Sequence, residues 1–337
     1  MKDYQFIRKK VIQQSKAFWE SVVKNAFFVI FPLLLLSILL TLGIAQGIVQ
    51  KETQRALLLP IPFSIPSPAF YPSVTTTVLG ASTSASVNLS ESADLSALGA
   101  VVMDDESKVI LFSKNPDLRF SMASTTKIMT ALVALEYYHL DDMLAVKTDH
   151  VEGTVIGFTE GEKLSFENLL YALLLPSAND AAFAIAQNYK GGEKAFVVRM
   201  NEKAQELHLY KTHFADPAGL EDDGDYTTVV DLARLASEAR KNQTLARIVA
   251  TKQKIITDDS REHQYTLVNL NKLLGIDGVN GIKTGFTDEA GGVLVTSKVE
   301  KGHTLLIVVM KSENRFLDTQ KLLSLVSGNI IYSSMHR

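Results

Sequence analysis

Three short strings, in this order along the chain, hold the residue types of a serine acyl-transfer site. They are Ser124-Thr125-Thr126-Lys127, Ser177-Ala178-Asn179 and Lys283-Thr284-Gly285. A serine hydroxyl attacks a carbonyl poorly until a base takes its proton, and a neutral lysine can be that base. The pattern predicts that Ser124 attacks an amide and holds the acyl group as an ester, while Lys127 accepts the proton.

Each string alone is a weak signal. S-x-x-K recurs at 21–24, and S-x-N recurs at 86–88 and 327–329. These extra matches lie in a basic tail, a low-complexity stretch and the last turns of the chain. The prediction therefore depends on the order of the three strings and on their local context.

Ser124 lies where a turn is expected to become a helix. At positions i and i+3, Ser124 and Lys127 share one helix face, so the amine can reach the hydroxyl. Helix N-terminal amides favour the negative charge that develops on an attacked carbonyl oxygen. Burial and a nearby cation, for which Lys283 is the candidate, would have to lower the pKa of Lys127. The alternative is a helix-capping Ser124 with a solvated Lys127.

The second string follows an apolar run, 169–176, and turns abruptly polar, as the wall of a cleft would. Ser177 is a candidate relay for a proton between Lys127 and the leaving amine, and Asn179 for holding the substrate backbone. An ordinary turn with a cap at Ser177 is the alternative.

The third string has a glycine where a substrate backbone would approach an edge strand. Lys283 and Thr284 are candidates for binding a carboxylate beside Gly285. A simple turn is the alternative for this string.

The elements that must position these residues lie between 95 and 337. Apolar patterning predicts strands at both ends and helices between them: strands at 97–103, 108–112, 292–297 and 303–310, and helices at 121–136, 166–174, 178–189, 193–207, 229–240 and 314–327. This order predicts an α/β (α+β) fold, with one antiparallel sheet packed against a helical region.

The N-terminal part has a different composition. Residues 26–49 carry no charge, and at ~1.5 Å per residue they are long enough to cross a hydrocarbon core of about 30 Å. The basic tail 1–25 before them predicts a cytoplasmic N-terminus and a single-pass anchor in the cell membrane. A signal peptide cleaved after Ala45 is the alternative. Residues 50–94, rich in Pro, Ser and Thr, predict a disordered linker that holds an extracytoplasmic catalytic domain, 95–337, off the membrane.

Composition excludes other chemistries. The chain has no cysteine, so it has no disulfide, thiol nucleophile or thiolate metal site. Its seven histidines show no H-E-x-x-H spacing, and His208 and His213 are interpreted as solvated or structural. We expect no metal and no cofactor. The net charge is −3, and without the six basic and two acidic residues of the tail it is −7, which argues against nucleic-acid binding.

The sequence resembles the D-alanyl-D-alanine carboxypeptidases, the low-molecular-mass penicillin-binding proteins. The resemblance runs from about 95 to 330 and rests on 120–132, 173–182, 212–214, 219–220 and 277–285. It implies the β-lactamase/transpeptidase-like fold, a peptidoglycan stem peptide ending in D-Ala-D-Ala as substrate, and β-lactams as covalent inhibitors.

The same resemblance implies roles for individual residues. Ser124 would attack the penultimate D-Ala carbonyl, with Lys127 as base and the backbone amides of Ser124 and Phe286 as the oxyanion hole. Arg315 matches the family arginine that helps to bind the terminal carboxylate. Asp216 and Asp225 depart from the pattern, since several members carry amide or histidine residues there.

Three alternatives to a carboxypeptidase remain. A class A β-lactamase would need a dedicated loop glutamate, and the candidates do not fit that role: Glu193, Glu202, Glu206 and Glu221. An endopeptidase that cuts cross-links between stem peptides would use the same residues. A catalytically silent penicillin-binding or wall-tethering module would bind without turnover.

The chain stops soon after the closing helix, which favours the N-terminal segment as its membrane anchor.

Overall fold

The computed structural model describes residues 83–87, 94–147 and 151–334. The predicted basic tail 1–25, the predicted anchor 26–49 and most of the predicted linker 50–94 lie outside these ranges. None of the helices in the described part of the chain combines the length and apolar character needed to cross a bilayer.

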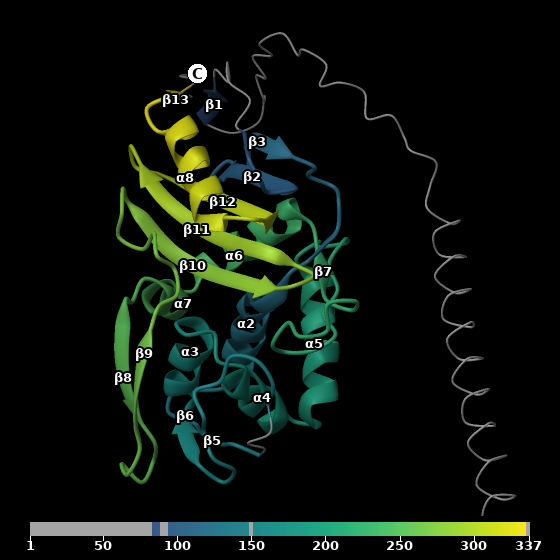
Figure 1. Cartoon of the computed structure of the whole chain (residues 1–337), viewed down its shortest axis with the longest axis vertical. Coiled ribbons are helices and arrows are strands. Elements are labelled where there is room, and N and C mark those ends of the chain that lie inside the picture. The colour runs from purple at the N-terminus through teal and green to yellow at the C-terminus, as the bar shows by residue number, and fades with distance from the viewer. Residues whose placement is uncertain (1–82, 88–93, 148–150, 335–337) are drawn as a thin grey trace, which may run out of the picture. The chain divides into compact units, whose positions relative to one another are not determined.

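A five-stranded antiparallel sheet forms the framework of the domain, in the order β10-β11-β12-β2-β3 (Figure 1). Its strands come from the two ends of the domain: β2 (Gly99–Asp104), β3 (Ile110–Lys114), β10 (Val279–Thr287), β11 (Gly291–Glu300) and β12 (His303–Ser312). The prediction of one antiparallel sheet built from both ends is confirmed. Strand β10 lies at an edge of this sheet.

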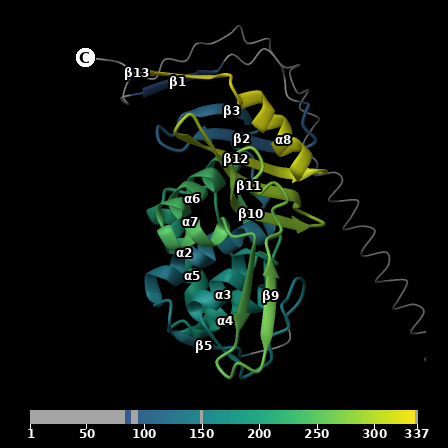
Figure 2. The ribbon, with the colours of Figure 1, turned by 90° about the vertical axis from the view of Figure 1, so that its left-hand side faces the viewer.

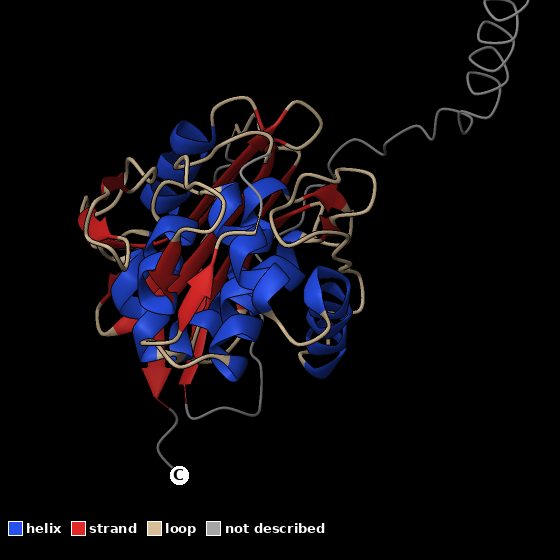
Figure 3. Cartoon of the chain, turned by 90° about the horizontal axis from the view of Figure 1, so that it is seen from below, coloured by secondary structure: helices blue, strands red, loops and turns tan. Residues whose placement is uncertain are grey.

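Both faces of the sheet are covered. Successive side chains of a strand point to opposite faces. Along β2, Val101 and Met103 therefore join the core on the helical side, while Ala100 and Val102 join the core that includes Leu322 of α8. Helix α8 (Arg315–Val326) packs on β11 and β12 from that second side (Figure 2). Seen from below, helices lie on both sides of the strands (Figure 3).

The helical region contains every helix predicted between the strands. Its members are α2 (Lys127–Tyr137), α3 (Phe166–Leu174), α4 (Asn179–Asn188), α5 (Gly192–Glu206), α6 (Val229–Lys241) and the unpredicted α7 (Gln243–Val249). Residues 127–134 of α2 are all buried, which fits a helix that is apolar on every side and lies inside the domain. This burial places Lys127 in the interior.

Four pairs of short strands complete the structure. They are β4 (Phe120–Ser121) with β7 (Tyr226–Thr227), β5 (Met143–Ala145) with β6 (Lys163–Ser165), β8 (Gln253–Thr257) with β9 (Gln264–Val268), and β1 (Thr83–Val87) with β13 (Ile330–Ser334). The sequence predicts a disordered linker over 50–94, and β1 lies inside that range. A segment too polar to fold alone can still pair its backbone with the edge of another strand.

Candidate active site

Ser124 lies in a short 3-10 helix, η1 (Ala123–Thr126), that leads directly into α2. The residues that cap η1 and α2 are Met122 and Thr126, so the alternative of Ser124 as a helix cap is wrong. Ala123 adopts a positive φ of 45°, an uncommon conformation for a residue with a side chain. The turn leaves Ser124 half-buried at the start of the central helix.

Lys127 is fully buried, and its amine has three partners. Nζ lies 3.0 Å from Ser124 Oγ, 2.7 Å from Asn179 Oδ1 and 2.6 Å from the carbonyl oxygen of Ala218. A neutral amine has two N–H groups and one lone pair. The two carbonyl oxygens can accept both N–H groups, which leaves the lone pair for the Ser124 hydroxyl proton. The alternative of a solvated Lys127 is wrong.

The electrostatic surroundings suit this arrangement. Burial lowers the pKa of Lys127 from its usual 10.5 to about 7, against the opposing effect of the Asp216, Asp225 and Asp180 carboxyl groups. Burial disfavours the charged form of an amine because the interior solvates it less well than water does. A large neutral fraction of Lys127 is therefore present near neutral pH.

Asn179 connects Lys127 to the chain segment at Glu152. It is the first residue of α4, and its Nδ2 donates to the carbonyl oxygen of Glu152 at 2.7 Å. This bond fixes the amide so that Oδ1 faces Lys127. Ser177 lies two residues earlier with a φ of 68°, and its buried Oγ has no hydrogen-bond partner among the described residues. Helix α4 is capped by Ala178, so the cap alternative for Ser177 is wrong.

Lys283, Thr284 and Gly285 lie within β10, so the alternative of a simple turn is wrong. A Cβ on Gly285 would lie 3.1 Å from Ala123 Cβ and 3.2 Å from the Ser124 backbone nitrogen. The strand therefore runs directly beside η1, and glycine permits this approach. Lys283 is buried, and its Nζ donates to the Thr284 carbonyl oxygen at 2.9 Å. Burial, and then the positive charges of Lys127 and Arg315, hold its pKa well below the usual value.

Arg315 and Phe286 lie next to this strand. Arg315 is the first residue of α8, and its guanidinium carbon lies 6.0 Å from the centre of the Phe286 ring. Its buried Nε has no hydrogen-bond partner in the described part of the chain. Phe286 is 61% exposed. Arg315 thus stands near Lys283 as a second cation with unused donor capacity.

Two residues of this site have no role in the sequence prediction. Asp216, noted there only as a departure from the family pattern, accepts four backbone N–H groups, from Ala218 and Gly219 and then from Leu220 and Glu221, at 2.5, 2.7, 2.8 and 2.8 Å. These bonds hold the loop that presents the Ala218 carbonyl oxygen to Lys127. The Asp-Pro-x-Gly sequence at 216–219 signals a turn, but a backbone acceptor carries no residue type that a sequence could reveal.

Gly219 brings that loop against η1. It has a φ of +81°, and a Cβ there would lie 2.0 Å from the carbonyl oxygen of Ala123. No larger residue fits without moving the backbone. The loop and η1 are therefore in direct contact beside Lys127.

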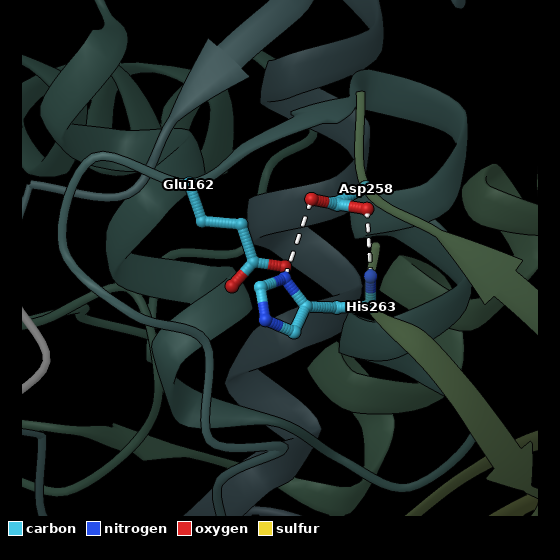
Figure 4. Close-up of side chains that lie close together, drawn as sticks. All are labelled: Glu162, Asp258 and His263. Carbon is cyan, nitrogen blue, oxygen red and sulfur yellow. Dashed lines mark hydrogen bonds and ion pairs between the residues drawn. The ribbon is translucent and has the colours of Figure 1, made fainter. Parts of the chain in front are cut away.

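A separate group of possible metal ligands lies beside the β8–β9 hairpin. Glu162, Asp258 and His263 offer ligand atoms within 4.8 Å of one another (Figure 4). Protein donors already serve both carboxylates: Tyr265 Oη donates to Glu162 at 2.9 and 3.0 Å, and the His263 backbone N–H donates to Asp258 at 3.1 Å. The hydrogen bonds described for these three residues do not reach Ser124 or Lys127.

Comparison with known proteins places this geometry in a family. The family profile described as D-alanyl-D-alanine carboxypeptidase, peptidase family S11, matches residues 85–314. The chain therefore belongs to this family of serine-type peptidases, as the sequence resemblance predicts. The fold is the transpeptidase-like α/β fold, with an antiparallel sheet and helices.

Individual relatives agree with this assignment. The chain is 34% identical over 224 residues to the D-alanyl-D-alanine carboxypeptidase DacF of Bacillus subtilis, a match that covers 64% of this chain and 57% of that protein. It is 34% identical over 231 residues to a D-alanyl-D-alanine endopeptidase of Pseudomonas aeruginosa, covering 66% and 74% of the two chains. The crystal structure of the Streptomyces K15 DD-transpeptidase superposes with a TM-score of 0.65 at 33% identity, covering 68% of this chain and 97% of that chain.

Proposed function

We propose that this protein is a serine-type D-Ala-D-Ala carboxypeptidase that removes the terminal D-Ala from peptidoglycan stem pentapeptides. The observation that carries the proposal is the position of Lys127 Nζ, 3.0 Å from Ser124 Oγ with two carbonyl acceptors on its other sides. A base with a pKa of about 7 is matched to proton transfer at neutral pH.

The first half of the reaction forms an ester. Lys127 takes the hydroxyl proton as Ser124 Oγ attacks the penultimate D-Ala carbonyl. The backbone N–H groups of Ser124 and Phe286 stabilise the resulting oxyanion. The C–N bond then breaks, and the amine of the departing D-Ala receives a proton from Lys127 by way of Ser177. The Ser177 hydroxyl, which has no hydrogen-bond partner within the described ranges, can serve as that relay.

The second half returns the enzyme to its starting state. A water molecule gives a proton to Lys127 and attacks the ester carbonyl. The C–O bond to Ser124 breaks, the shortened peptide leaves as a carboxylic acid, and Ser124 recovers its proton. β-Lactams, which are cyclic amides, would enter at the first step and remain as esters.

The substrate lies along the exposed edge of β10. Because β10 is an edge strand, its outer backbone groups can pair with an extended peptide. Asn179 binds a backbone amide of the peptide, and Gly285 lets the peptide approach Ser124. The terminal carboxylate is bound by Thr284 and the two cations Lys283 and Arg315.

Cross-link cleavage is the second candidate function. It is favoured by the 34% identity to a relative named as an endopeptidase. We also propose that the enzyme is anchored in the cell membrane with its catalytic domain outside, a proposal supported by the charge-free residues 26–49.

Mass spectrometry of peptidoglycan fragments tests these proposals. The full-length chain in detergent is incubated with pentapeptide-containing monomers and with cross-linked dimers, beside the Ser124→Ala variant. We expect pentapeptides to lose one alanine with the wild type and none with the variant. If the cross-linked dimers were cut while the pentapeptides stayed intact, the protein would be an endopeptidase rather than a carboxypeptidase. A wild type that changes neither substrate would contradict both and favour a silent binding module.

A further inference from the structure

Asp225 is a fully buried carboxyl group close to the catalytic lysine. Its Oδ1 accepts the backbone N–H of Ala215 at 2.9 Å. Its Oδ2 is also buried and accepts no hydrogen bond from the described residues. A buried carboxylate is costly when one of its oxygens accepts no hydrogen bond and contacts no cation. A carboxylic acid can instead donate a hydrogen bond from that oxygen. The geometry therefore favours a protonated Asp225.

The neighbouring Asp216 has the opposite environment. Its two oxygens share four backbone N–H donors, which stabilise the charged form. The burial of Asp225, together with this neighbouring charge, raises the pKa of Asp225 to about 9. Two adjacent buried carboxyl groups rarely ionise together, because each charge disfavours the other.

Both acids act on Lys127. Asp216 orders the loop whose Ala218 carbonyl accepts from Lys127 Nζ at 2.6 Å. Asp216 and Asp225 are also the two largest carboxyl influences that favour the charged form of Lys127. Each negative charge on this pair therefore raises the pKa of Lys127, so that less of the amine is neutral and able to accept a proton at neutral pH.

We propose that Asp216 and Asp225 are a positioning pair that carries a single negative charge, with the proton on Asp225, and that this sharing lets Lys127 act as a neutral base. The pair fixes the Ala218 carbonyl through Asp216 and limits the negative charge beside Lys127 through Asp225. The inference rests on the proposed function, since it assumes that Lys127 is the base for Ser124.

Other charged groups face Asp225 as well. Asp222 lies on the same loop, and its charge also favours the proton on Asp225. His213 pairs with Tyr226 through the backbone, and Lys127 faces the acids from α2. These groups stay the same in the three variants of Asp216 and Asp225 below, so they cannot produce differences between those variants.

The test uses the pH dependence of Ser124 acylation by a fluorescent penicillin, between about pH 5 and pH 10. It compares the full-length wild type with Asp225→Asn, Asp216→Asn and the double variant. Rates fall on the acid side as Lys127 gains its proton, so the midpoint of that fall reports the pKa of Lys127.

If one charge is shared, Asp225→Asn removes none and keeps the wild-type midpoint. In Asp216→Asn, burial still keeps the proton on Asp225, so the pair loses its charge and the midpoint should fall by about one pH unit. In the double variant the pair carries no negative charge, so we expect its midpoint to lie about one pH unit below that of the wild type. A purely structural role would scale the rates without moving the midpoints.

Two results would overturn the proposal. If Asp225→Asn alone lowers the midpoint as far as the double variant, Asp225 is charged in the wild type. If the double variant keeps the wild-type midpoint, the pair does not act on Lys127. Asp222→Asn is the matched control, an acid of the same loop whose carboxylate accepts from Thr287 Oγ1 at 2.8 Å, and it should leave the midpoint unchanged.

Infrared spectroscopy keeps the question decidable if an Asp216 variant fails to fold. A protonated carboxyl band at pH 7 should be present in the wild type and absent from Asp225→Asn. Absence of the band from the wild type would contradict the shared proton. Penicillin acylation and the infrared band do not depend on which peptide is trimmed, so a failed carboxypeptidase assay leaves this result standing.

Discussion

Two buried lysines flank Ser124 in opposite electrostatic settings. Lys127 comes from α2 and Lys283 from β10, and they are 0% and 1% exposed. The amine of Lys127 has three hydrogen-bond partners, and the ionisable groups that favour its charged form are the carboxyl groups of Asp216, Asp225 and Asp180. The amine of Lys283 donates to one carbonyl, and the charges that act on it are those of two cations.

The difference shows how one residue type takes two roles. Nearby carboxyl groups offset part of the burial cost for Lys127, so its pKa stays near 7 and its proton can leave and return. Nothing of that kind offsets the cost for Lys283, whose pKa is held well below its usual value. Lys283 therefore gains a negatively charged partner only when an anion binds beside it. In the proposed reaction that anion is the substrate carboxylate.

Removal of the base should have the largest effect. We expect Lys127→Ala to fold normally and to acylate with penicillin roughly 10²–10⁴-fold more slowly at pH 7, the usual contribution of a general base. Lys127→Arg should be as slow, because a guanidinium stays protonated and cannot accept the proton. Stopped-flow labelling measures the rate and circular dichroism the fold. A rate in Lys127→Ala within threefold of the wild type would refute the base assignment.

The sequence predicts most of this framework because the framework depends on the types and spacing of side chains. The apolar runs and the helical spacing identify the sheet strands β2, β3, β11 and β12 and the helices around them. The S-x-x-K spacing brings Lys127 to Ser124, and the S-x-N string brings Asn179 to the same amine.

Other features were beyond sequence reasoning for physical reasons. The Ala218 carbonyl is a backbone group that any residue would supply, and the position of its loop depends on the close contact of Gly219 with Ala123, far away in the sequence. The hairpin β8–β9 alternates exposed with partly buried residues over only five residues per strand, a short signal. Strand β1 forms from polar residues because a partner strand is present, and that pairing is not local.

Loss of the second lysine should have a smaller effect, and mainly on binding. We expect Lys283→Ala to raise the KM for a D-Ala-D-Ala peptide by roughly 10- to 100-fold, the effect of losing one hydrogen bond to a charged group. The kcat should change much less, because Lys283 does not exchange the reacting proton in the proposed mechanism. Steady-state kinetics on the pentapeptide measures both constants.

A substrate without the carboxylate sharpens this comparison. The wild type should bind the peptide methyl ester at least as weakly as Lys283→Ala binds the acid, because the ester also loses its charge contact with Arg315. With the ester, Lys283→Ala should bind only slightly more weakly than the wild type. Equal losses on the acid and the ester would mean that Lys283 does not act through the substrate carboxylate. The same ester should leave the acid-side midpoint set by Lys127 in place.

The smallest effect is expected for a carboxylate that serves neither lysine. Hydrogen bonds from Ser260 and His263 hold the pKa of Asp258 at about 2, against a usual 3.8. A carboxyl group whose pKa is lower in the folded chain contributes stability above its unfolded pKa, and that contribution disappears as the pH falls through about 2. Asp258→Asn should therefore lower the Tm by a few degrees at pH 7 and leave it near that of the wild type around pH 2.

The rate of acylation by penicillin shows whether the effect of Asp258→Asn is confined to the surroundings of Asp258. Asp258 is not among the charges that act on Lys127 or Lys283, so Asp258→Asn should label with penicillin at the wild-type rate and with the wild-type midpoint. A shifted midpoint in Asp258→Asn would mean that distant carboxylates also set the pKa of Lys127. The contrast between the two lysines would then reflect the net charge of the domain rather than their immediate neighbours.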